Sequence, residues 1–151
     1  MGITITREFD APRELVWKAW TEPESFARWW GPKNFTAPSI RMDVKVGGSY
    51  LWCMRGPDGR EYRTTGTFSI VDPPSRLAYT DSFADADGNI VPSTHYGMDD
   101  VPMETTVTVT LEDYGGRTRM TLHHEGLSGE NGEMAGVGWN ESFDKLAASL
   151  R

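Results

Sequence analysis

The side chains best suited to chemistry in this sequence are three histidines, a single cysteine and several carboxylates. His123 and His124 are adjacent, and because neighbours on a strand point to opposite faces, they do not form a metal-binding pair. His95 stands apart, and no two histidines have the i, i+4 spacing of a helical metal site. We therefore predict neither a metal site nor a cofactor.

An inward-facing histidine near a carboxylate is the main candidate for acid–base chemistry. His124 with Asp81 or Glu125 has the parts of a general base, since a histidine in a dry pocket titrates near neutrality. We favour the simpler interpretation, a hydrogen-bonded histidine that holds a neighbouring hydroxyl. Cys53 falls on the outward parity of its strand, which favours a structural thiol. No nucleophile elbow, Walker loop or dinucleotide-binding motif occurs, so no catalytic residue is assigned and an enzyme is the less favoured outcome.

Composition and charge disfavour several classes of partner. The 151 residues carry a formal net charge of −7, which works against binding a polyanion such as nucleic acid. One cysteine permits no intrachain disulfide, which suits a reducing compartment. Residues 1–9 carry early charges and no apolar h-region, and no stretch is near the ~20 apolar residues of a membrane span, so we expect neither export nor insertion. We therefore expect a cytoplasmic protein that binds neither nucleic acid nor membrane.

Turn-forming glycine, proline and aspartate residues separate the periodic segments, and the resulting order predicts a single α+β domain over residues 1–151. Alternation predicts a first strand over 3–9, and two short helices follow. An antiparallel meander of six strands is expected near 36–45, 49–56, 61–71, 76–83, 104–113 and 117–125. The segment 84–102 is expected to be a long loop of the kind that covers binding sites. After Ser128 the pattern is helical, and this helix is long enough to cover the sheet.

The two short helices have start and stop signals of their own. Asp10 is a candidate cap for the first helix, which has Pro12 in its first turn. A capping box at 21–24 predicts the start of the second helix, and Gly31 and Pro32 are expected to end it. This second helix is expected to carry Phe26, Trp29 and Trp30.

Strand alternation also predicts which side chains face the covered side of the sheet. Gly66, Phe68 and Ile70 share that face on one strand. The candidate ligand-binding residues are Trp30, Tyr50, Trp52, Met54, Phe68, Tyr79, Asp81, Met120, His124, Trp139 and Phe143. An ordinary packed core explains this set equally well. The polar tips of the aromatic side chains need partners, and the closing helix tolerates several glycines, so we favour a void beneath Trp139 and Phe143.

Several motifs resemble those of one known family. They are Phe9-Asp10-Ala11-Pro12, Trp29-Trp30-Gly31-Pro32, Gly47-Gly48-Ser49-Tyr50, Pro57-Asp58-Gly59 and Gly138-Trp139 followed by Ser142-Phe143. In order and spacing the chain resembles the START-like (SRPBCC) superfamily and, within it, the bacterial homologues of the activator of heat shock protein 90 ATPase. The resemblance implies a helix-grip fold, in which a long C-terminal helix and a curved antiparallel sheet enclose a hydrophobic cavity. It also implies cavity-lining roles for Trp52, Met54, His124 and Trp139.

Three functions are compatible with these observations. The leading hypothesis is binding or sequestration of a small hydrophobic or aromatic ligand in an internal cavity, without catalysis. The second is a cyclase- or dehydratase-type enzyme that uses His124, Asp81 or Tyr79 as acid or base. The third, implied by the resemblance, is a stress-response module that interacts with a chaperone.

Overall fold

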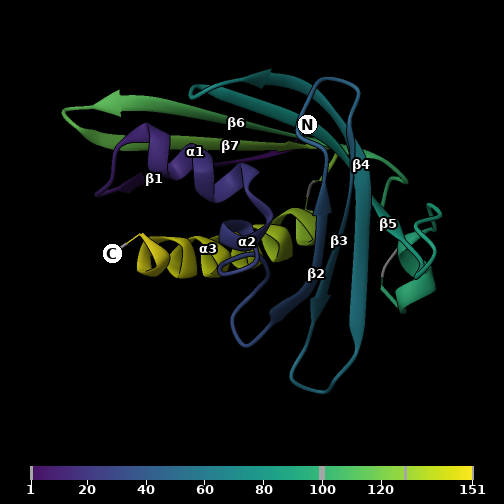
Figure 1. Ribbon diagram of the computed structural model, residues 1–151. Coiled ribbons are helices and arrows are strands. Elements are labelled where there is room, and N and C mark those ends of the chain that lie inside the picture. The colour runs from purple at the N-terminus through teal and green to yellow at the C-terminus, as the bar shows by residue number, and fades with distance from the viewer. Residues whose placement is uncertain (1, 99–100, 128, 151) are drawn as a thin grey trace.

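The fold is an antiparallel sheet gripped by one long helix (Figure 1). The computed structural model describes residues 2–98, 101–127 and 129–150. Within these ranges the strands are β1 (Gly2–Phe9), β2 (Thr36–Met42), β3 (Ser49–Arg55), β4 (Glu61–Asp72), β5 (Arg76–Ala84), β6 (Thr105–Tyr114) and β7 (Arg117–Glu125). The helices are α1 (Arg13–Thr21), α2 (Pro23–Phe26), the 3-10 helix η1 (Ser93–Tyr96) and α3 (Gly129–Ser149). This order confirms the predicted α+β helix-grip class.

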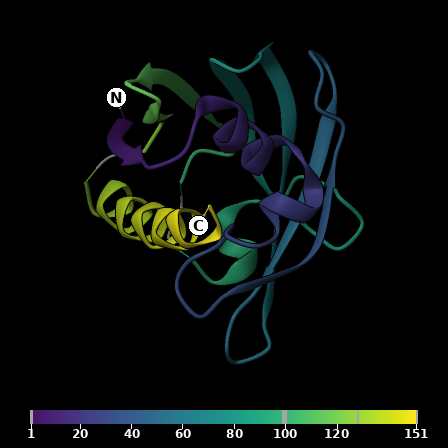
Figure 2. The ribbon, with the colours of Figure 1, turned by 60° about the vertical axis from the view of Figure 1, so that its left-hand side comes forward.

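The described strands form one seven-stranded sheet in the order β1-β7-β6-β5-β4-β3-β2, with every neighbouring pair antiparallel. The sheet is strongly curved: in Figure 1, β1, β6 and β7 run across the view, whereas β2, β3 and β4 run down it. Figure 2 shows α1 and α2 on the same side of the sheet as α3. The predicted meander is confirmed, with strand ends that differ from the expected ones by a few residues.

A bulge in β4 changes which side chains face inward. The register between β4 and β5 shifts between Phe68 and Ile70, so Ile70 pairs with Ala78 and Val71 with Leu77. One inserted residue reverses the alternation of every residue after it. Val71 therefore packs against the core beside Leu77, and the prediction that Ile70 faces inward is wrong.

The short helices begin differently from their sequence signals. Pro12 is the N-cap of α1 and no side chain caps this helix, so the prediction of an Asp10 cap is wrong. The N-cap of α2 is Glu22, and the hydroxyl of Thr21 donates to the carbonyl oxygen of Trp17 instead of capping. Proline at the start of α2 fits the first turn because its missing N–H has no helical partner there.

The helix α2 is also shorter than expected and ends at Phe26. Trp29 and Trp30 lie in the turn that follows, and the backbone N–H of each donates to the carbonyl oxygen of Phe26. Both tryptophans are buried nonetheless. The turn thus adds two large aromatic side chains to the core without lengthening the helix.

Aromatic side chains fill the space beneath the C-terminal half of α3. Trp139 stacks on Phe143 with ring centroids 5.5 Å apart, and the ring of Trp20 lies 6.1 Å from that of Trp139. Trp20 is buried between the helices and the sheet, and its indole N–H contacts the sulfur of Met120. The predicted void beneath Trp139 and Phe143 is therefore occupied by protein.

Polar contacts hold α3 in place along its length. Arg7 on β1 forms an ion pair with Asp144 at 2.9 Å. The ammonium group of Lys145 donates to the carbonyl oxygens of Pro32 and Phe35, at 3.2 and 3.1 Å. Near the start of α3, a Cβ on Gly132 would lie 3.0 Å from Ile3, so this glycine permits a close approach to β1. Among the described helices, none has the length and apolar character needed to cross a bilayer.

Candidate functional site

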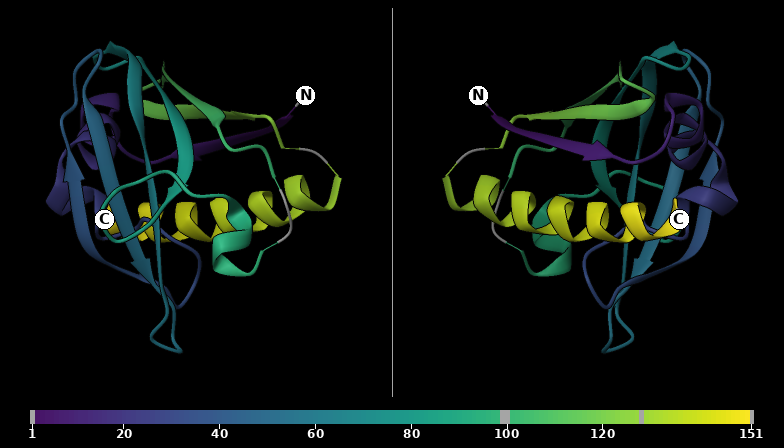
Figure 3. Two further views of the ribbon diagram at one scale, coloured as in Figure 1. Left: turned by 90° about the vertical axis from the view of Figure 1, so that its right-hand side faces the viewer. Right: turned by 90° about the vertical axis from the view of Figure 1, so that its left-hand side faces the viewer.

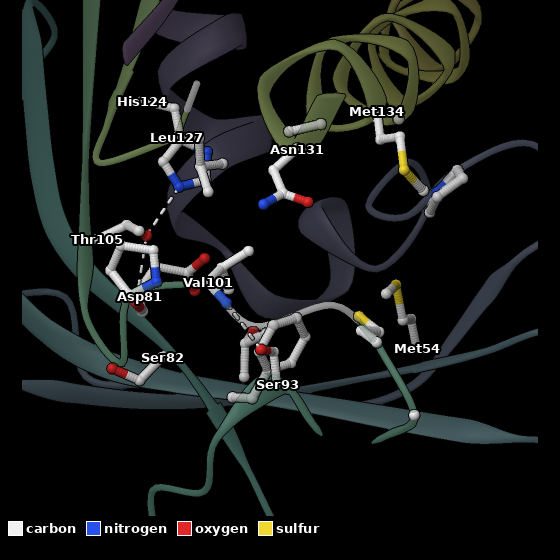
Figure 4. A pocket seen from close by; sticks show the side chains of 18 residues that line it. Met54, Asp81, Ser82, Ser93, Val101, Thr105, His124, Leu127, Asn131 and Met134 are labelled. Carbon is white, nitrogen blue, oxygen red and sulfur yellow. Dashed lines mark hydrogen bonds between the residues drawn. The ribbon is translucent and has the colours of Figure 1, made fainter. Parts of the chain in front are cut away.

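A pocket of about 580 Å³ opens beneath the N-terminal half of α3 (Figure 4). Its apolar lining includes Met54, Phe83, Met98, Val101, Leu127 and Met134. Its polar lining includes Thr64, Asp81, Ser82, Thr105, His124 and Asn131. Small-molecule sites typically measure about 300–1,000 Å³ and combine mostly apolar walls with a few polar groups. The size and lining of this pocket fit that description.

The periodicity of α3 explains where the open space lies. Asn131, Met134, Ala135 and Gly138 line the pocket at i, i+3, i+4 and i+7, which places them on one face of the helix. Toward the C-terminus, Trp139 and the residues after it fill the core. Toward the N-terminus, alanine and glycine on this face leave room. In the left view of Figure 3 the segment carrying η1 lies in front of α3, and its residues Ser93, Gly97 and Met98 line the pocket together with this half of the helix.

The structure places the sequence-derived candidates in two groups. Met54, Asp81 and His124 line the pocket. The aromatic core beside it contains Trp30, Tyr50, Trp52, Phe68, Tyr79, Met120, Trp139 and Phe143. The α3 face, Met98 and Val101 were not among the candidates named from the sequence, although the loop over 84–102, which carries both of the latter, was expected to cover a binding site. The small residues on one face of α3 were a usable signal for the helix. The length of the loop was the signal for the segment that carries Met98 and Val101, but nothing local marks these two residues individually.

His124 is held in one tautomer by its two neighbours. The indole N–H of Trp139 can only donate, and it lies 3.1 Å from Nδ1 of His124. Nδ1 is therefore unprotonated, and Nε2 carries the proton and donates to the hydroxyl of Thr105 at 2.8 Å. That hydroxyl lies 3.3 Å from the carbonyl oxygen of Asp81, to which it donates in turn. His124 on β7 therefore links Trp139 on α3 to Thr105 on β6, and Thr105 in turn is hydrogen-bonded to the backbone of Asp81 on β5.

Burial, reinforced by the neighbouring His123, lowers the pKa of His124 to about 4. The imidazole is therefore neutral near pH 7, and its acceptor lone pair is already used by Trp139. A general base needs a lone pair free to take a proton from the substrate. His124 serves as a structural hydrogen-bonding side chain at the pocket wall.

Asp81 is the one charged side chain that lines the pocket among the described residues. Its Oδ1 accepts a hydrogen bond of 2.8 Å from the hydroxyl of Tyr50, which lies 2.8 Å from the carbonyl oxygen of Thr80 as well. Tyr50 has a single proton to share between these two acceptors. Burial raises the pKa of Asp81 to about 6, and the hydrogen bond from Tyr50 opposes this rise.

Gly66 makes this hydrogen bond possible. It pairs with Tyr50 across β3 and β4, and a Cβ on it would lie 1.8 Å from the carbonyl oxygen of Thr80. Because Gly66 has no side chain, the Tyr50 side chain passes over β4 at this position and its hydroxyl reaches Thr80 and Asp81 on β5. An aromatic ring laid over a strand glycine is a known way of covering the exposed backbone there.

Three buried polar atoms have no hydrogen-bond partner among the described residues: Trp52 Nε1, Thr64 Oγ1 and the hydroxyl of Tyr79. Trp52 and Tyr79 pack edge to face with ring centroids 5.3 Å apart, and Thr64 pairs with Trp52 across the strands. An unsatisfied buried polar atom costs about 1–3 kcal/mol. Of the three residues, Thr64 itself lines the pocket.

The other chemically reactive candidates lie away from the pocket. His123 points to the opposite face from His124 and contacts the hydroxyl of Thr4 at 2.9 Å and the carboxylate of Glu125 at 2.6 Å. Cys53 is buried, and burial raises the pKa of its thiol. No group of three or more His, Cys, Asp or Glu side chains capable of holding a metal ion is found in the described parts of the chain.

Comparison with known proteins identifies the family. The family described as "Activator of Hsp90 ATPase homolog 1-like protein" matches residues 10–151. A solved structure from Arthrobacter aurescens is 34% identical, with a TM-score of 0.82, over 97% of this chain and 84% of that one. A protein from Chromobacterium violaceum is 27% identical, with a TM-score of 0.82, over 98% of this chain and 95% of that one.

The AHSA1 protein from Silicibacter pomeroyi is 25% identical, with a TM-score of 0.79, and the match covers 98% of this chain and 96% of that one. No match is found among curated proteins. The family match spans nearly the entire chain, and the structural matches reproduce the curved sheet and the long helix. The chain therefore belongs to the activator of Hsp90 ATPase homolog 1-like family, within the START-like superfamily that its motifs resemble.

Proposed function

We propose that the protein binds a small, largely apolar molecule in the pocket beneath the N-terminal half of α3, and that it acts by binding or sequestration. The observation that carries this proposal is the pocket itself, about 580 Å³ in volume, with methionine, valine and leucine side chains on its walls. Methionine side chains adapt to irregular ligands because they are unbranched and polarisable. Met54, Met98 and Met134 come from three separate parts of the chain and meet there.

Binding is favoured over catalysis because the acid–base candidates are constrained. The acceptor nitrogen of His124 is occupied, and the hydroxyl of Tyr79 is buried and stays protonated because burial raises its pKa well above the ordinary value. Asp81 is the remaining candidate from the cyclase or dehydratase hypothesis. A single carboxyl group without a partner acid or base supports that hypothesis less well than it supports ligand recognition.

A pocket-filling variant tests the proposal. Ala135 lines the pocket, whereas Val137 on the same helix is 61% exposed and does not. In a panel of small hydrophobic and aromatic compounds, we expect binders to raise the melting temperature of the wild type and of Val137→Phe. The same compounds should leave Ala135→Phe unchanged, because the added ring occupies their site. A broad panel without binders, or undiminished binding by Ala135→Phe, would contradict the proposal.

The family match supports a second candidate, interaction with an Hsp90-type chaperone in the cytoplasm. The measurement is the ATPase rate of the chaperone with and without the chain. A surface interaction should be retained by Ala135→Phe, so this variant separates it from ligand binding. An unchanged ATPase rate and the absence of a complex would remove this candidate.

A further inference from the structure

We propose that the pocket selects a cationic ligand, a protonated amine on an apolar or aromatic body, whose ammonium group pairs with Asp81. This inference rests on the proposed binding function and specifies the ligand class. It follows from the charges that line the pocket, from the hydrogen-bonding state of Asp81 and from an unpaired hydroxyl on the same wall.

Among the described residues, the only formal charge that lines the pocket is negative. Asp81 lines it, and no lysine or arginine does so among the described residues. The titratable groups around Asp81 are Tyr50 on β3, Tyr79 on β5 itself and, across β6, His124 on β7. Both phenols and the imidazole are neutral near pH 7. Nothing within the described protein neutralises this carboxylate.

Asp81 also has unused bonding capacity. Oδ1 accepts a hydrogen bond from Tyr50, while Oδ2 has no hydrogen bond from any described residue. A carboxylate withdrawn from water without a counter-ion is destabilising, and the rise of its pKa to about 6 expresses that cost. An ammonium group at Oδ2 would form a charge-assisted hydrogen bond and supply the missing counter-charge.

The hydroxyl of Thr64 is a second, independent indication of a polar ligand group. Thr64 is 6% exposed, lines the pocket, and its Oγ1 has no partner among the described residues. It pairs with Phe83, two residues along β5 from Asp81, so both side chains lie on the same face of the sheet. An ammonium group has three donors, which allows it to address both a carboxylate and a nearby hydroxyl oxygen.

A matched series of ligands tests the preference for charge. We would measure the affinities of 2-(1-naphthyl)ethylamine, 2-(1-naphthyl)ethanol and 1-naphthylacetate by calorimetry at neutral pH, since the three share one ring system. We expect the amine to bind about tenfold more tightly than the alcohol, because hydrogen bonds to charged groups are the stronger ones. The acetate should bind most weakly, because it is repelled by Asp81. An acetate that binds as tightly as the amine would overturn the inference.

A charge-removing variant tests the role of Asp81. Asp81→Asn should lower the ratio of amine to alcohol affinity to about one. Glu133→Gln, which removes the same charge from an exposed position of α3 outside the pocket, should keep the ratio of the wild type. An unchanged preference for the amine in Asp81→Asn would contradict the inference.

The wild type provides the same test without substitution. Acidification from about pH 7.5 to about pH 5 protonates Asp81, whose pKa lies at about 6, while His124 with a pKa of about 4 stays largely neutral. The amine remains protonated throughout, so its advantage over the alcohol should shrink on acidification. A preference that is constant with pH would count against Asp81 as the partner.

The outcomes separate the two proposals. If the alcohol binds and Ala135→Phe abolishes its binding, but the amine has no advantage, the pocket binds ligands and the inference about charge is wrong. If none of the three compounds binds, and the broader panel also gives no binder, both proposals are wrong.

Discussion

At the scale of single residues, the informative feature is how the proton of Tyr50 is shared. With Asp81 ionised, the hydroxyl faces two acceptors, Asp81 Oδ1 and the carbonyl oxygen of Thr80. With Asp81 protonated, the carboxyl group can donate to Tyr50, and Tyr50 can donate to Thr80 alone. Burial raises the pKa of Asp81 to about 6, whereas the hydrogen bond that Tyr50 donates to the ionised carboxylate opposes this rise.

Removal of this hydroxyl should move the pKa of Asp81 further upward. The hydrogen bond from Tyr50 favours the ionised carboxylate, so Tyr50→Phe should raise the pKa above about 6. The measurement is a titration of the Asp81 carboxyl carbon by NMR. Tyr62→Phe, on the inner face of β4 and without a hydrogen bond to Asp81, is the matched control. An unchanged or lowered pKa in Tyr50→Phe would show that the hydrogen bond has been misassigned.

At the scale of elements, two glycines have opposite roles. Gly66 lies in β4 where a Cβ would collide with the backbone of β5 at 1.8 Å. Gly136 lies in α3, where a Cβ would meet nothing within 4 Å. Close packing makes the first position intolerant of a side chain, whereas helix propensity alone acts at the second.

The corresponding alanine variants should therefore change stability in opposite directions. Gly66→Ala should lower the free energy of unfolding by more than about 3 kcal/mol, because the strands must separate. Gly136→Ala should raise it by about 0.5–1 kcal/mol, because alanine loses less backbone freedom in a helix. Urea unfolding followed by Trp fluorescence measures both values. A Gly66→Ala protein as stable as the wild type would show that β4 and β5 are farther apart than described.

The sequence predicted the strands well, but it did not predict the irregularities within them. Period-two alternation correctly predicted the strands and the opposite orientation of His123 and His124, because that pattern is local. The bulge beside Ser69 was missed, since it depends on how β4 pairs with β5. The loop over 84–102 was expected to cover a binding site, but which of its residues meet Asn131 and Met134 could not be predicted, because long-range packing decides it.

At the scale of the whole molecule, Asp81 and His124 act against each other on acidification. His124 has an ordinary value of 6.5 and a folded pKa of about 4, so the unfolded chain binds the extra proton and stability falls as the pH drops through this window. Asp81 has an ordinary value of 3.8 and a folded pKa of about 6, so the folded chain binds the extra proton and stability rises. Between about pH 6 and pH 4 the two contributions largely offset each other.

Removal of the Asp81 carboxyl group should reveal the pH dependence of stability that His124 contributes. Asp81→Asn should make the free energy of unfolding fall more steeply with acidification than in the wild type, by roughly 1.4 kcal/mol per pH unit, since one compensating proton is lost. Urea unfolding between about pH 6 and about pH 4.5 measures the slope. Glu133→Gln, an exposed change of equal charge, should keep the slope of the wild type. Parallel slopes for Asp81→Asn and the wild type would mean that Asp81 titrates at an ordinary pKa.

The methionines of the pocket give the molecule a vulnerability to oxidants. Met134 is 71% exposed and Met98 is 36% exposed, so peroxide reaches both thioethers without unfolding the chain. Conversion of a thioether to a sulfoxide replaces a flexible apolar group with a polar one. In the oxidised protein the pocket would be lined by more polar side chains at these two positions, and methionine sulfoxide reductases would restore the apolar thioethers.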